Sequence, residues 1–583
     1  MRYQADDFQG LTPSIDPRKS DKLFALDGRN YVFDSFGPKS VFGNRFLTPY
    51  PLGAPAWSQG MRLRLRTGDR TFTFTTDSIL EWREDLGCWR VLYYFDQNLL
   101  LSPYRWTGDY LSGIMFFCHP GVGIIAYDLD LDVCEPLVGP GVPDQPIAIC
   151  QDNGRICAID ESAYSWSAPG DGTNWTPQLG GAGFQLINAR VSGYPIMIDS
   201  YGRGTITWTT GGVMRSEFTG DASVYRHRQL VTEYRPVNSF CTFRLDNDTI
   251  VLLDERGFFK TQGETPVALT PLFNEFLIDY LQRNNLKLGT NCRVEFDDLQ
   301  RRIYLSVSDS YSDPIFEKAF VLYAPIDKWG TFDEQHYGII PLLIKESSRA
   351  DDYFGFVDLD GRVKYWTNGA SREIPPIDPT LNSYYPVNQK PAVAGASGEY
   401  TILGSSMEFN TLDTSVYSQR AGYYDAGGIS PASSNITGLD SVIQLGFVRI
   451  TSEQEYDQLC EISQILVGSV TANPYAYPID DFNLVPDGVS DEDYNAEVGG
   501  EDFGIEDVSY ADHGLRIIPT IDGRSPFGDP VTPDLITFQR ATREYSCSAV
   551  GLFNIIEFSA TEVGEYYHLR ILELNALDGG RLN

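Results

Sequence analysis

The side chains that most often do chemistry in enzymes occur here without the spacings that catalytic motifs require. The chain has five histidines, at positions 119, 227, 336, 513 and 568, and no two have metal-ligand spacing. The stretch Gly37 to Ser40 lacks the first glycine of a phosphate-binding loop. Motifs for a nucleophilic serine or for zinc hydrolases and deaminases are absent. The sequence therefore predicts a protein that is not an enzyme and has no cofactor.

Carboxylates are the exception, because the chain contains 79 Asp and Glu residues. Glycoside hydrolysis needs only two carboxylates at a defined separation, so an enzyme that degrades polysaccharide stays an alternative. Calcium also binds carboxylate oxygens, but the pair at 480–481 and the triplet at 491–493 do not fit a calcium loop. Asp128, Asp130 and Asp132 alternate with apolar residues, which predicts a half-exposed strand. We expect no metal site.

The densest acidic segment lies near the C-terminus. Residues 450–515 contain 16 acidic residues and no Lys or Arg. Within this stretch, residues 480–513 carry no sustained periodicity and are predicted to form a long acidic loop, of the length that is usually functional or disordered. Its acidic residues are Asp480, Asp481, Asp487, Asp491, Glu492, Asp493, Glu497, Glu501, Asp502, Glu506, Asp507 and Asp512.

Composition limits the remaining functions. The formal charge of −34 argues against a surface that grips the DNA backbone, since such surfaces rely on Lys and Arg. A content of 42% apolar and 13% aromatic residues argues for a folded chain. The nine cysteines show no C-x-x-C pair and are expected to be reduced, as in a protein made in the cytoplasm. No signal peptide and no membrane span are expected.

A repeated pattern predicts the fold of residues 61–370. Short apolar runs end at Asp77, Asp128, Asp160, Asp199, Asp254, Asp309 and Asp358, with intervals of 51, 32, 39, 55, 55 and 49 residues. These intervals scatter around the length of a four-stranded propeller blade, ~40–50 residues. In each case we expect the Asp to accept a hydrogen bond from a backbone N–H two residues on. Aromatic returning strands, such as Tyr164 to Trp166, would fill the space between blades. The pattern predicts a β-propeller of five to seven blades.

The rest of the chain divides into three parts. Residues 271–287 predict one amphipathic helix, with Leu272, Phe276, Tyr280 and Leu281 on its apolar side, packed on the propeller. Residues 371–399 are a Pro-rich connector. Residues 400–583 are expected to form a β-sandwich-like platform domain that contains the acidic loop. Its predicted strands lie at 400–411, 441–450, 460–470, 514–521, 534–539, 547–560 and 566–574. The fold class is therefore mainly β with few helices.

Two segments carry a resemblance to known families. The stretch from Ser167 to Trp175 resembles the Asp-box turn of sialidase-like propellers, which is structural in that family. The opening segments Gly10–Leu11 through Asp16–Pro17, Leu26–Asn30 and Asp34–Pro38 look like the start of a family of bacteriophage virion proteins. Together with the propeller pattern, they are similar to the tail nozzle family, also called tail tubular protein B or tail hub, of short-tailed phages.

The resemblance implies a structural virion protein that forms a nozzle tube through which DNA is ejected. It implies a homo-oligomer, a hexameric ring, below the portal-adaptor proteins, with docking surfaces for tail fibre or tailspike proteins. Residues 1–60 would contribute to the platform. Genomic DNA would pass without tight binding, since an acidic lumen repels phosphate. The protein would be assembled in the bacterial cytoplasm and located in the virion tail.

Three readings stay open at this point. The first is the nozzle, in which the acidic loop 480–513 is a candidate lumen or gating loop, although an external solvated loop fits equally well. The second is a sialidase-like or other polysaccharide-degrading propeller enzyme. The third is a receptor-binding protein without catalysis.

Overall fold

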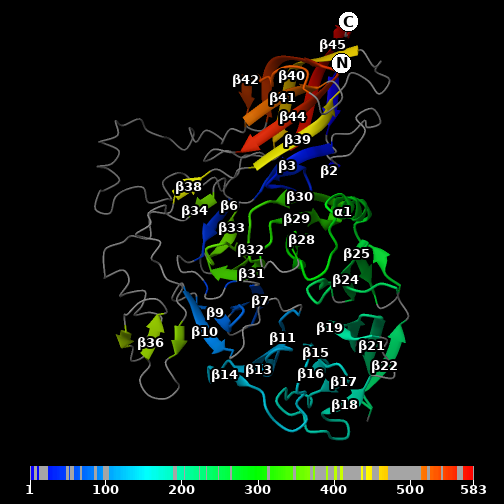
Figure 1. Cartoon of the computed structure of the whole chain (residues 1–583), viewed down its shortest axis with the longest axis vertical. Coiled ribbons are helices and arrows are strands. Elements are labelled where there is room, and N and C mark those ends of the chain that lie inside the picture. The colour runs from blue at the N-terminus through cyan, green and yellow to red at the C-terminus, as the bar shows by residue number, and fades with distance from the viewer. Residues whose placement is uncertain are drawn as a thin grey trace.

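The computed structural model of the chain describes residues 2–581 with internal gaps. The gaps are 6–8, 12–23, 42, 48–51, 53–54, 56–57, 66–68, 84–87, 96–103, 188–192, 203, 222, 231–232, 247, 263–264, 311–314, 346–349, 368–371, 375–388, 392–398, 403–407, 411–434, 438–440, 449–457, 470–513, 521–525, 540–541 and 561–568. The described residues form two parts, a propeller and a platform, that lie one above the other in Figure 1.

The propeller consists of seven antiparallel sheets that follow one another along the chain. Blade one has β7 (Gln59–Leu63), β8 (Arg70–Phe74), β9 (Ser78–Arg83) and β10 (Cys88–Tyr94), and blade two has β11 (Thr107–Leu111), β12 (Ile114–His119), β13 (Gly123–Asp128) and β14 (Val133–Pro136). Blade three has β15 (Ala148–Asp152), β16 (Arg155–Ile159), β17 (Ala163–Trp166) and β18 (Gly183–Leu186), and blade four has β19 (Pro195–Tyr201), β20 (Gly204–Thr209), β21 (Gly212–Phe218) and β22 (Tyr225–Leu230).

Blade five has β23 (Thr242–Asp246), β24 (Thr249–Asp254), β25 (Gly257–Thr261) and β26 (Val267–Ala268), and blade six has β27 (Cys292–Asp297), β28 (Arg302–Val307), β29 (Lys318–Tyr323) and β30 (Lys328–Phe332). Blade seven has β31 (Gly338–Lys345), β32 (Ala350–Val357) and β33 (Val363–Thr367). Second strands such as β24 and β28 are buried along their whole length, because a neighbouring blade covers each face. The predicted propeller is therefore confirmed.

The N-terminal segment completes blade seven and extends blade six. Blade seven takes its fourth strand from β6 (Gly43–Phe46), which pairs with β33. Blade six is extended by β4 (Tyr31–Phe33) and β5 (Pro38–Ser40), which pair onto β30. The ring closes between blades seven and one, where the Thr71 hydroxyl accepts from the Leu343 N–H at 2.9 Å. Blades six and seven thus pair with strands that precede blade one in the sequence.

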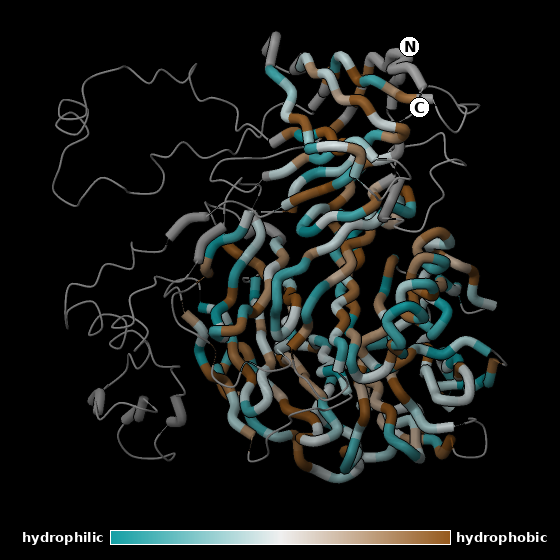
Figure 2. The backbone as a smooth tube through the Cα atoms, turned by 45° about the horizontal axis from the view of Figure 1, so that its top comes forward, coloured by the Kyte–Doolittle hydropathy of each residue, from teal (hydrophilic) through white to brown (hydrophobic). Residues whose placement is uncertain are grey.

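The platform is a sandwich of two five-stranded sheets made from both ends of the chain. One sheet has the order β1 (Arg2–Ala5), β45 (Leu569–Arg581), β40 (Gln458–Ser469), β43 (Thr542–Gly551) and β42 (Asp534–Gln539). The other has the order β2 (Gln9–Leu11), β3 (Phe24–Arg29), β39 (Ser441–Val448), β44 (Phe553–Ala560) and β41 (Gly514–Thr520). Apolar and hydrophilic residues alternate along many strands of both parts (Figure 2), as expected where one strand face is buried.

Buried side chains from both platform sheets meet in one core, to which Ile465 and Leu574 contribute from the first sheet and Ile443 and Phe558 from the second. Two predicted strands are wrong in extent. The run 400–411 contains two strands, β36 (Glu399–Ile402) and β37 (Glu408–Asn410), which pair with each other in a sheet outside the sandwich. The run 547–560 is divided at Leu552 between β43 and β44, which belong to different sheets. The chain changes sheets there, so a continuous apolar run supplies both halves of the core.

One α-helix lies within the described residues, α1 (Pro271–Arg283), between blades five and six (Figure 1). The predicted helix is confirmed, but its apolar side is corrected. Phe273 and Leu277 are buried, whereas Leu272 is 52% exposed. The Asp327 carboxylate accepts from the backbone N–H of Leu272 at 2.7 Å, in the first turn of α1. Leu281 is buried as predicted, and Phe276 and Tyr280 pack against the same core. No helix within the described residues is long and apolar enough to cross a membrane.

Short strands occupy the segment between the two parts. They are β34 (Arg372–Ile374), β35 (Gln389–Pro391), β36 (Glu399–Ile402), β37 (Glu408–Asn410) and β38 (Asn435–Thr437). Blade six also contains a 3₁₀ turn, η1 (Ala324–Ile326), between β29 and β30. β34 and β38 extend blade seven beyond β6. Most of the predicted connector 371–399 lies outside the described residues.

Candidate functional site

The predicted acidic loop 480–513 lies outside the described residues, and so do the twelve acidic residues named for it. Its role in a lumen or gate stays a prediction from sequence. The described residues contain no group of three or more His, Cys, Asp or Glu side chains that could hold a metal ion. The candidate sites in the described part of the chain are therefore polar clusters of the propeller.

Five of the seven Asp residues of the repeat occupy the same position in their blades, at the end of the second strand. Asp77, Asp160, Asp254, Asp309 and Asp358 follow the second strands of blades one, three, five, six and seven. Two of the predicted positions are wrong. Asp128 ends the third strand of blade two, and Asp199 lies in the first strand of blade four, where its carboxylate accepts from the Trp208 indole at 2.9 Å. These two explain much of the scatter in the intervals.

Other residue types supply the turn acceptor in four blades. In blade one, the Thr75 hydroxyl accepts from the Ser78 N–H at 3.2 Å, whereas the Asp77 carboxylate accepts from the hydroxyls of Thr75 and Ser78. In blade two, Nδ1 of His119 accepts from the Gly121 N–H at 3.1 Å. In blade four, the Thr209 hydroxyl accepts from the Gly211 N–H at 3.3 Å. In blade six, the Ser308 hydroxyl accepts from the Ser310 N–H at 3.2 Å, so Ser308 rather than Asp309 fills the role. A search for any short acceptor at a spacing of ~40–55 residues would have found them.

The hydrogen bond from the Gly121 N–H to His119 requires a neutral imidazole ring. Nδ1 accepts only when it carries no proton, so the ring must be neutral. Burial lowers the pKa of His119 to about 4, which keeps it neutral at pH 7. The Asp160 carboxylate fills the equivalent position in blade three and accepts from the backbone N–H groups of Ser162 and Ala163, each at 2.6 Å. These turns hold the blades in shape and present no free group for catalysis.

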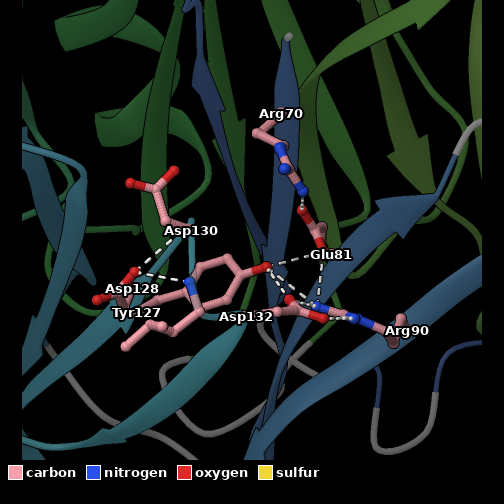
Figure 3. Close-up of polar contacts among 8 residues, drawn as sticks. Arg70, Glu81, Arg90, Tyr127, Asp128, Asp130 and Asp132 are labelled. Carbon is pink, nitrogen blue, oxygen red and sulfur yellow. Dashed lines mark hydrogen bonds and ion pairs between the residues drawn. The ribbon is translucent and has the colours of Figure 1, made fainter. Parts of the chain in front are cut away.

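The segment from Asp128 to Asp132 is a turn and not the half-exposed strand predicted from its alternation. The Asp128 carboxylate accepts from the N–H groups of Asp130 and Leu131, both at 2.9 Å. Asp132 has a φ of 58°, in the left-handed region that Asp tolerates better than most residues. The turn aims Asp132 back towards blade one (Figure 3), so the three carboxylates do not converge on one point.

Asp132 belongs to a buried polar cluster between blades one and two, the Glu81 cluster (Figure 3), which comprises Arg70, Glu81, Arg90, Tyr127 and Asp132. The Glu81 carboxylate is fully buried and forms ion pairs with Arg70 and, at 3.2 Å, with Arg90. Arg90 also donates two hydrogen bonds to Asp132, at 2.5 and 2.6 Å. The Tyr127 hydroxyl donates to Asp132 at 2.7 Å. Each acid therefore faces at least one cation.

The electrostatics of this cluster favour permanent charges. Hydrogen bonds from Arg90 lower the pKa of Asp132 to about 2, and burial raises the pKa of Tyr127. Asp132 thus stays ionised and Tyr127 stays protonated across the physiological range. Asp132 and Tyr127, which keep one protonation state across this range, are suited to joining two blades and not to moving protons.

A second polar cluster lies on or just before the first strands of the blades, which surround the propeller axis. This axial cluster comprises Arg105, Asp109, Arg293 and Glu295. Arg105, just before β11, donates to the Thr242 carbonyl of blade five at 3.1 Å, so it reaches across the axis. Arg293 of blade six donates to the Ser58 carbonyl, just before blade one, at 3.0 Å. Its guanidinium also lies over the Phe240 ring, 4.1 Å from the centroid. These contacts tie distant blades together where their first strands begin.

The axial carboxylates are matched by these arginines. Burial raises the pKa of Glu295, while Arg105, Arg293 and Arg62 act in the opposite direction. Asp109 accepts from the Gln151 N–H of the next blade at 2.8 Å, and its pKa is also raised by burial. A raised pKa is what a general acid needs. Here, however, Asp109 is held by the backbone N–H groups of Gln151 and Tyr110, and Glu295 lies in the electrostatic field of three arginines.

A cavity of about 350 Å³ lies between blades four and five. It is lined by Thr210, Gly211, Gly212, Glu233, Arg235, Asp254, Glu255 and Arg256. Arg256 donates to Asp254 at 2.7 Å and lies over the Tyr234 ring, and Arg235 donates to the Thr210 carbonyl at 3.0 Å. The charged groups of the wall are thus largely committed to one another.

The Asp-box-like segment joins the third and fourth strands of blade three. Asp171 accepts from the Thr173 N–H at 3.0 Å, and the buried Trp175 indole donates to the Gly172 carbonyl at 2.8 Å. A Cβ at Gly172 would lie 2.5 Å from the Phe116 ring of blade two. The segment is a packed turn, distant in the blade from the axial cluster.

Comparisons with known proteins add the following. No family model matches the chain, and no curated protein matches it. Among solved structures, the extracellular domain of a hybrid two-component system from B. thetaiotaomicron is similar with a TM-score of 0.34 and 11% identity over 57% of this chain; the chain spans 42% of that protein's length. U3-55K is similar with a TM-score of 0.35 and 8% identity over 56% of this chain and 98% of the other.

Proposed function

We propose that this chain is a structural virion protein of a phage tail, one subunit of a hexameric nozzle tube through which DNA is ejected. It would sit below the portal-adaptor proteins and offer a docking surface for fibres or tailspikes. The observation that carries the proposal is the place of the residues that resemble the nozzle family. Those at 26–38 form the junction between platform and propeller, whereas residues 12–17 lie outside the described residues.

The junction is built from the motif residues themselves. Asn30, at the end of β3 in the platform, exchanges two hydrogen bonds with Asp333 after blade six, at 3.1 and 2.8 Å. Asp34 caps the hairpin β4–β5 by accepting from the Phe36 N–H at 2.9 Å. Gly28 approaches β39 so closely that a Cβ would lie 2.5 Å from the Val442 carbonyl. A rigid junction of this kind suits a subunit that bears load.

The charge and the polar clusters support the same proposal. A net charge of −34 suits a conduit that repels phosphate and lets the duplex slide. Within the described residues, the buried acids of the Glu81 and axial clusters face arginines or backbone donors. These partners disfavour the rival enzyme, which needs one carboxylate free to donate a proton and another to attack or to activate water.

Assembly is the first test. Negative-stain electron microscopy of the purified full chain, alone and mixed with the other tail proteins of its phage, is expected to reveal rings or tail-like tubes. Monomers under both conditions would contradict the proposal. An electrophoretic mobility assay at low salt is expected to show no binding of double-stranded DNA, because binding would require basic surface.

Activity is the second test. Incubation of the chain with host capsule or envelope polysaccharide is expected to release no reducing sugar. Release that is abolished in Glu295→Gln and retained in the exposed-residue control Asp298→Asn would favour the polysaccharide-degrading alternative. Direct binding of the isolated chain to whole cells, without sugar release, would favour a receptor-binding protein.

A further inference from the structure

Two cysteines from neighbouring blades lie next to each other. Cys241 directly precedes β23, the first strand of blade five, and Cys292 begins β27, the first strand of blade six. Their sulfur atoms are 3.7 Å apart, and both side chains are fully buried. The two first strands belong to different sheets and share no ladder of backbone hydrogen bonds. The sulfur pair is therefore a contact between blades.

The backbone around the pair is fixed on both sides. The Asn238 amide donates to the carbonyls of Gly289 and Cys292, at 2.5 and 3.0 Å. The Val294 N–H donates to the Phe240 carbonyl at 3.3 Å, so the segments that carry the cysteines are hydrogen-bonded across the blade boundary. Since a disulfide bond is ~2.05 Å long, each sulfur needs to move by less than ~1 Å, which side-chain rotation can provide.

We infer that Cys241 and Cys292 are a site of oxidative modification, at which a disulfide bond forms between blades five and six. The oxidant is a low-molecular-weight disulfide. One cysteine thiolate attacks it, forms a mixed disulfide and releases one thiol; the other cysteine then attacks the mixed disulfide and releases the second. The protein loses two hydrogen atoms, and the oxidant is reduced to two thiols.

The cross-link would matter because of what it encloses. The closed loop from Cys241 to Cys292 contains all of blade five and α1. Burial raises the pKa of Cys241, so its thiol reacts slowly until the blade boundary opens. The reduced form is expected inside a cell and the oxidised form after release into an oxidising medium. That order of events rests on the proposed function; the bond itself does not.

The test uses the purified full chain. Reduced protein is incubated with glutathione disulfide, in one arm in native buffer and in the other at a urea concentration just below the unfolding transition. Remaining thiols are alkylated, and the chain is digested and mapped by mass spectrometry without reduction. A Cys241–Cys292 peptide in either arm supports the inference, with seven of the nine thiols still free. Absence from both arms, or linkage of Cys150 to Cys157 alone, overturns it.

Variants provide the controls. Oxidation is expected to raise the melting temperature of the wild-type chain by ~5 °C, because a loop of about 50 residues is closed in the unfolded state. Cys292→Ser should lose the rise and Cys150→Ser should keep it. If Cys292→Ser does not fold, the peptide map of the wild-type chain decides whether the bond forms. Because the readout is a bond within one chain, monomers in the microscope would contradict the proposed function and leave this result unchanged.

Discussion

The propeller and the platform are both made of strands, but they are assembled in different ways. Each of the first six blades forms its four strands from one continuous stretch of chain, whereas both platform sheets combine strands from residues 2–29 with strands from residues 441–581. Local hairpins cost little loop-closure entropy, and pairing across hundreds of residues costs more. The platform therefore depends on the rest of the chain being in place.

Their interiors differ as well. The blade boundaries contain buried charges, of which Glu81 is fully buried between two arginines. The platform core, by contrast, is lined by aliphatic and aromatic side chains such as Ile465 and Phe558. The propeller thus combines apolar packing between blades with buried ion pairs that need specific partners, whereas the platform core named here depends on apolar packing. The comparison can be tested part by part, because all nine tryptophans lie between positions 57 and 366.

The largest effect is expected at Glu81. Glu81→Ala leaves Arg70 and Arg90 without their shared buried partner, and loss of one member of a buried ion pair costs ~3–5 kcal/mol. Urea unfolding followed by tryptophan fluorescence should shift by this amount. The control is Asp298→Ala, whose carboxylate is 66% exposed and pairs with Arg62, with an expected loss below ~0.5 kcal/mol. Equal shifts in the two variants would show that the cluster does not hold the blades.

A large cavity in the platform core should destabilise the platform before the propeller. Phe558→Ala removes a fully buried ring and is expected to cost ~3–4 kcal/mol. Circular dichroism, which reports both parts, should show an earlier transition, while tryptophan fluorescence should shift less. Arg516→Ala, which loses a partly exposed ion pair with Glu557, is the control and should change little. Coincident shifts of both signals would mean that the parts unfold together.

Acid should weaken the propeller through its buried histidines. Burial lowers the pKa of His336 from 6.5 to about 4, so the unfolded chain takes up the proton first as the pH falls. The stability contribution of the neutral ring is thus present above pH 6.5 and lost towards pH 4, by ~3 kcal/mol. His336→Gln should flatten the dependence of the fluorescence-detected unfolding free energy on pH in this window.

Asp358 is expected to change stability with pH in the opposite direction to His336. Burial raises its pKa to about 6, so the folded state binds the proton first and gains stability as the pH falls through 6. Asp358→Asn should therefore make the loss of stability in acid steeper, whereas His336→Gln makes it shallower. Parallel profiles for both variants and the wild type would remove these two groups as the cause.

The smallest effect separates true turn acceptors from neighbouring carboxylates. Asp160→Ala removes the acceptor of two backbone N–H groups and is expected to cost ~1 kcal/mol. Asp309→Ala should cost less than ~0.5 kcal/mol, because Ser308 serves the turn of blade six. Ser308→Ala should then behave like Asp160→Ala. A larger loss at Asp309 than at Ser308 would restore the original assignment.

Much of the propeller could be predicted because its information is local. An apolar run followed by a short acceptor describes a buried second strand and its turn. The pattern placed five of its seven Asp residues at the end of a second strand, and Asp160, Asp254 and Asp358 accept from the backbone of the turn. His119 and Thr209 were missed because the turn requires an acceptor atom and not a particular residue type. Asp199 was misplaced because its carboxylate serves an indole of the next strand instead of a turn.

The polar clusters could not be predicted in the same way. Asp132 and Arg90 are 42 positions apart, and Asn30 and Asp333 are 303 apart. The local sequence does not indicate that the two residues of either pair are partners, because each is an ordinary charged or polar residue beside a strand. Cys241 and Cys292 also have no motif spacing, and only the packing of two blades brings their sulfur atoms together.

By itself, the sequence determined a mainly β chain with a propeller of repeated blades, one amphipathic helix and a strongly acidic balance, because strand periodicity, turn chemistry and net charge depend on neighbours or on totals. The tertiary structure decided that the described residues form seven blades, that residues 31–46 extend the sixth and complete the seventh, and that both chain ends share one platform. Those features depend on which surfaces meet, and burial and pairing over long separations are settled only when the whole chain has folded.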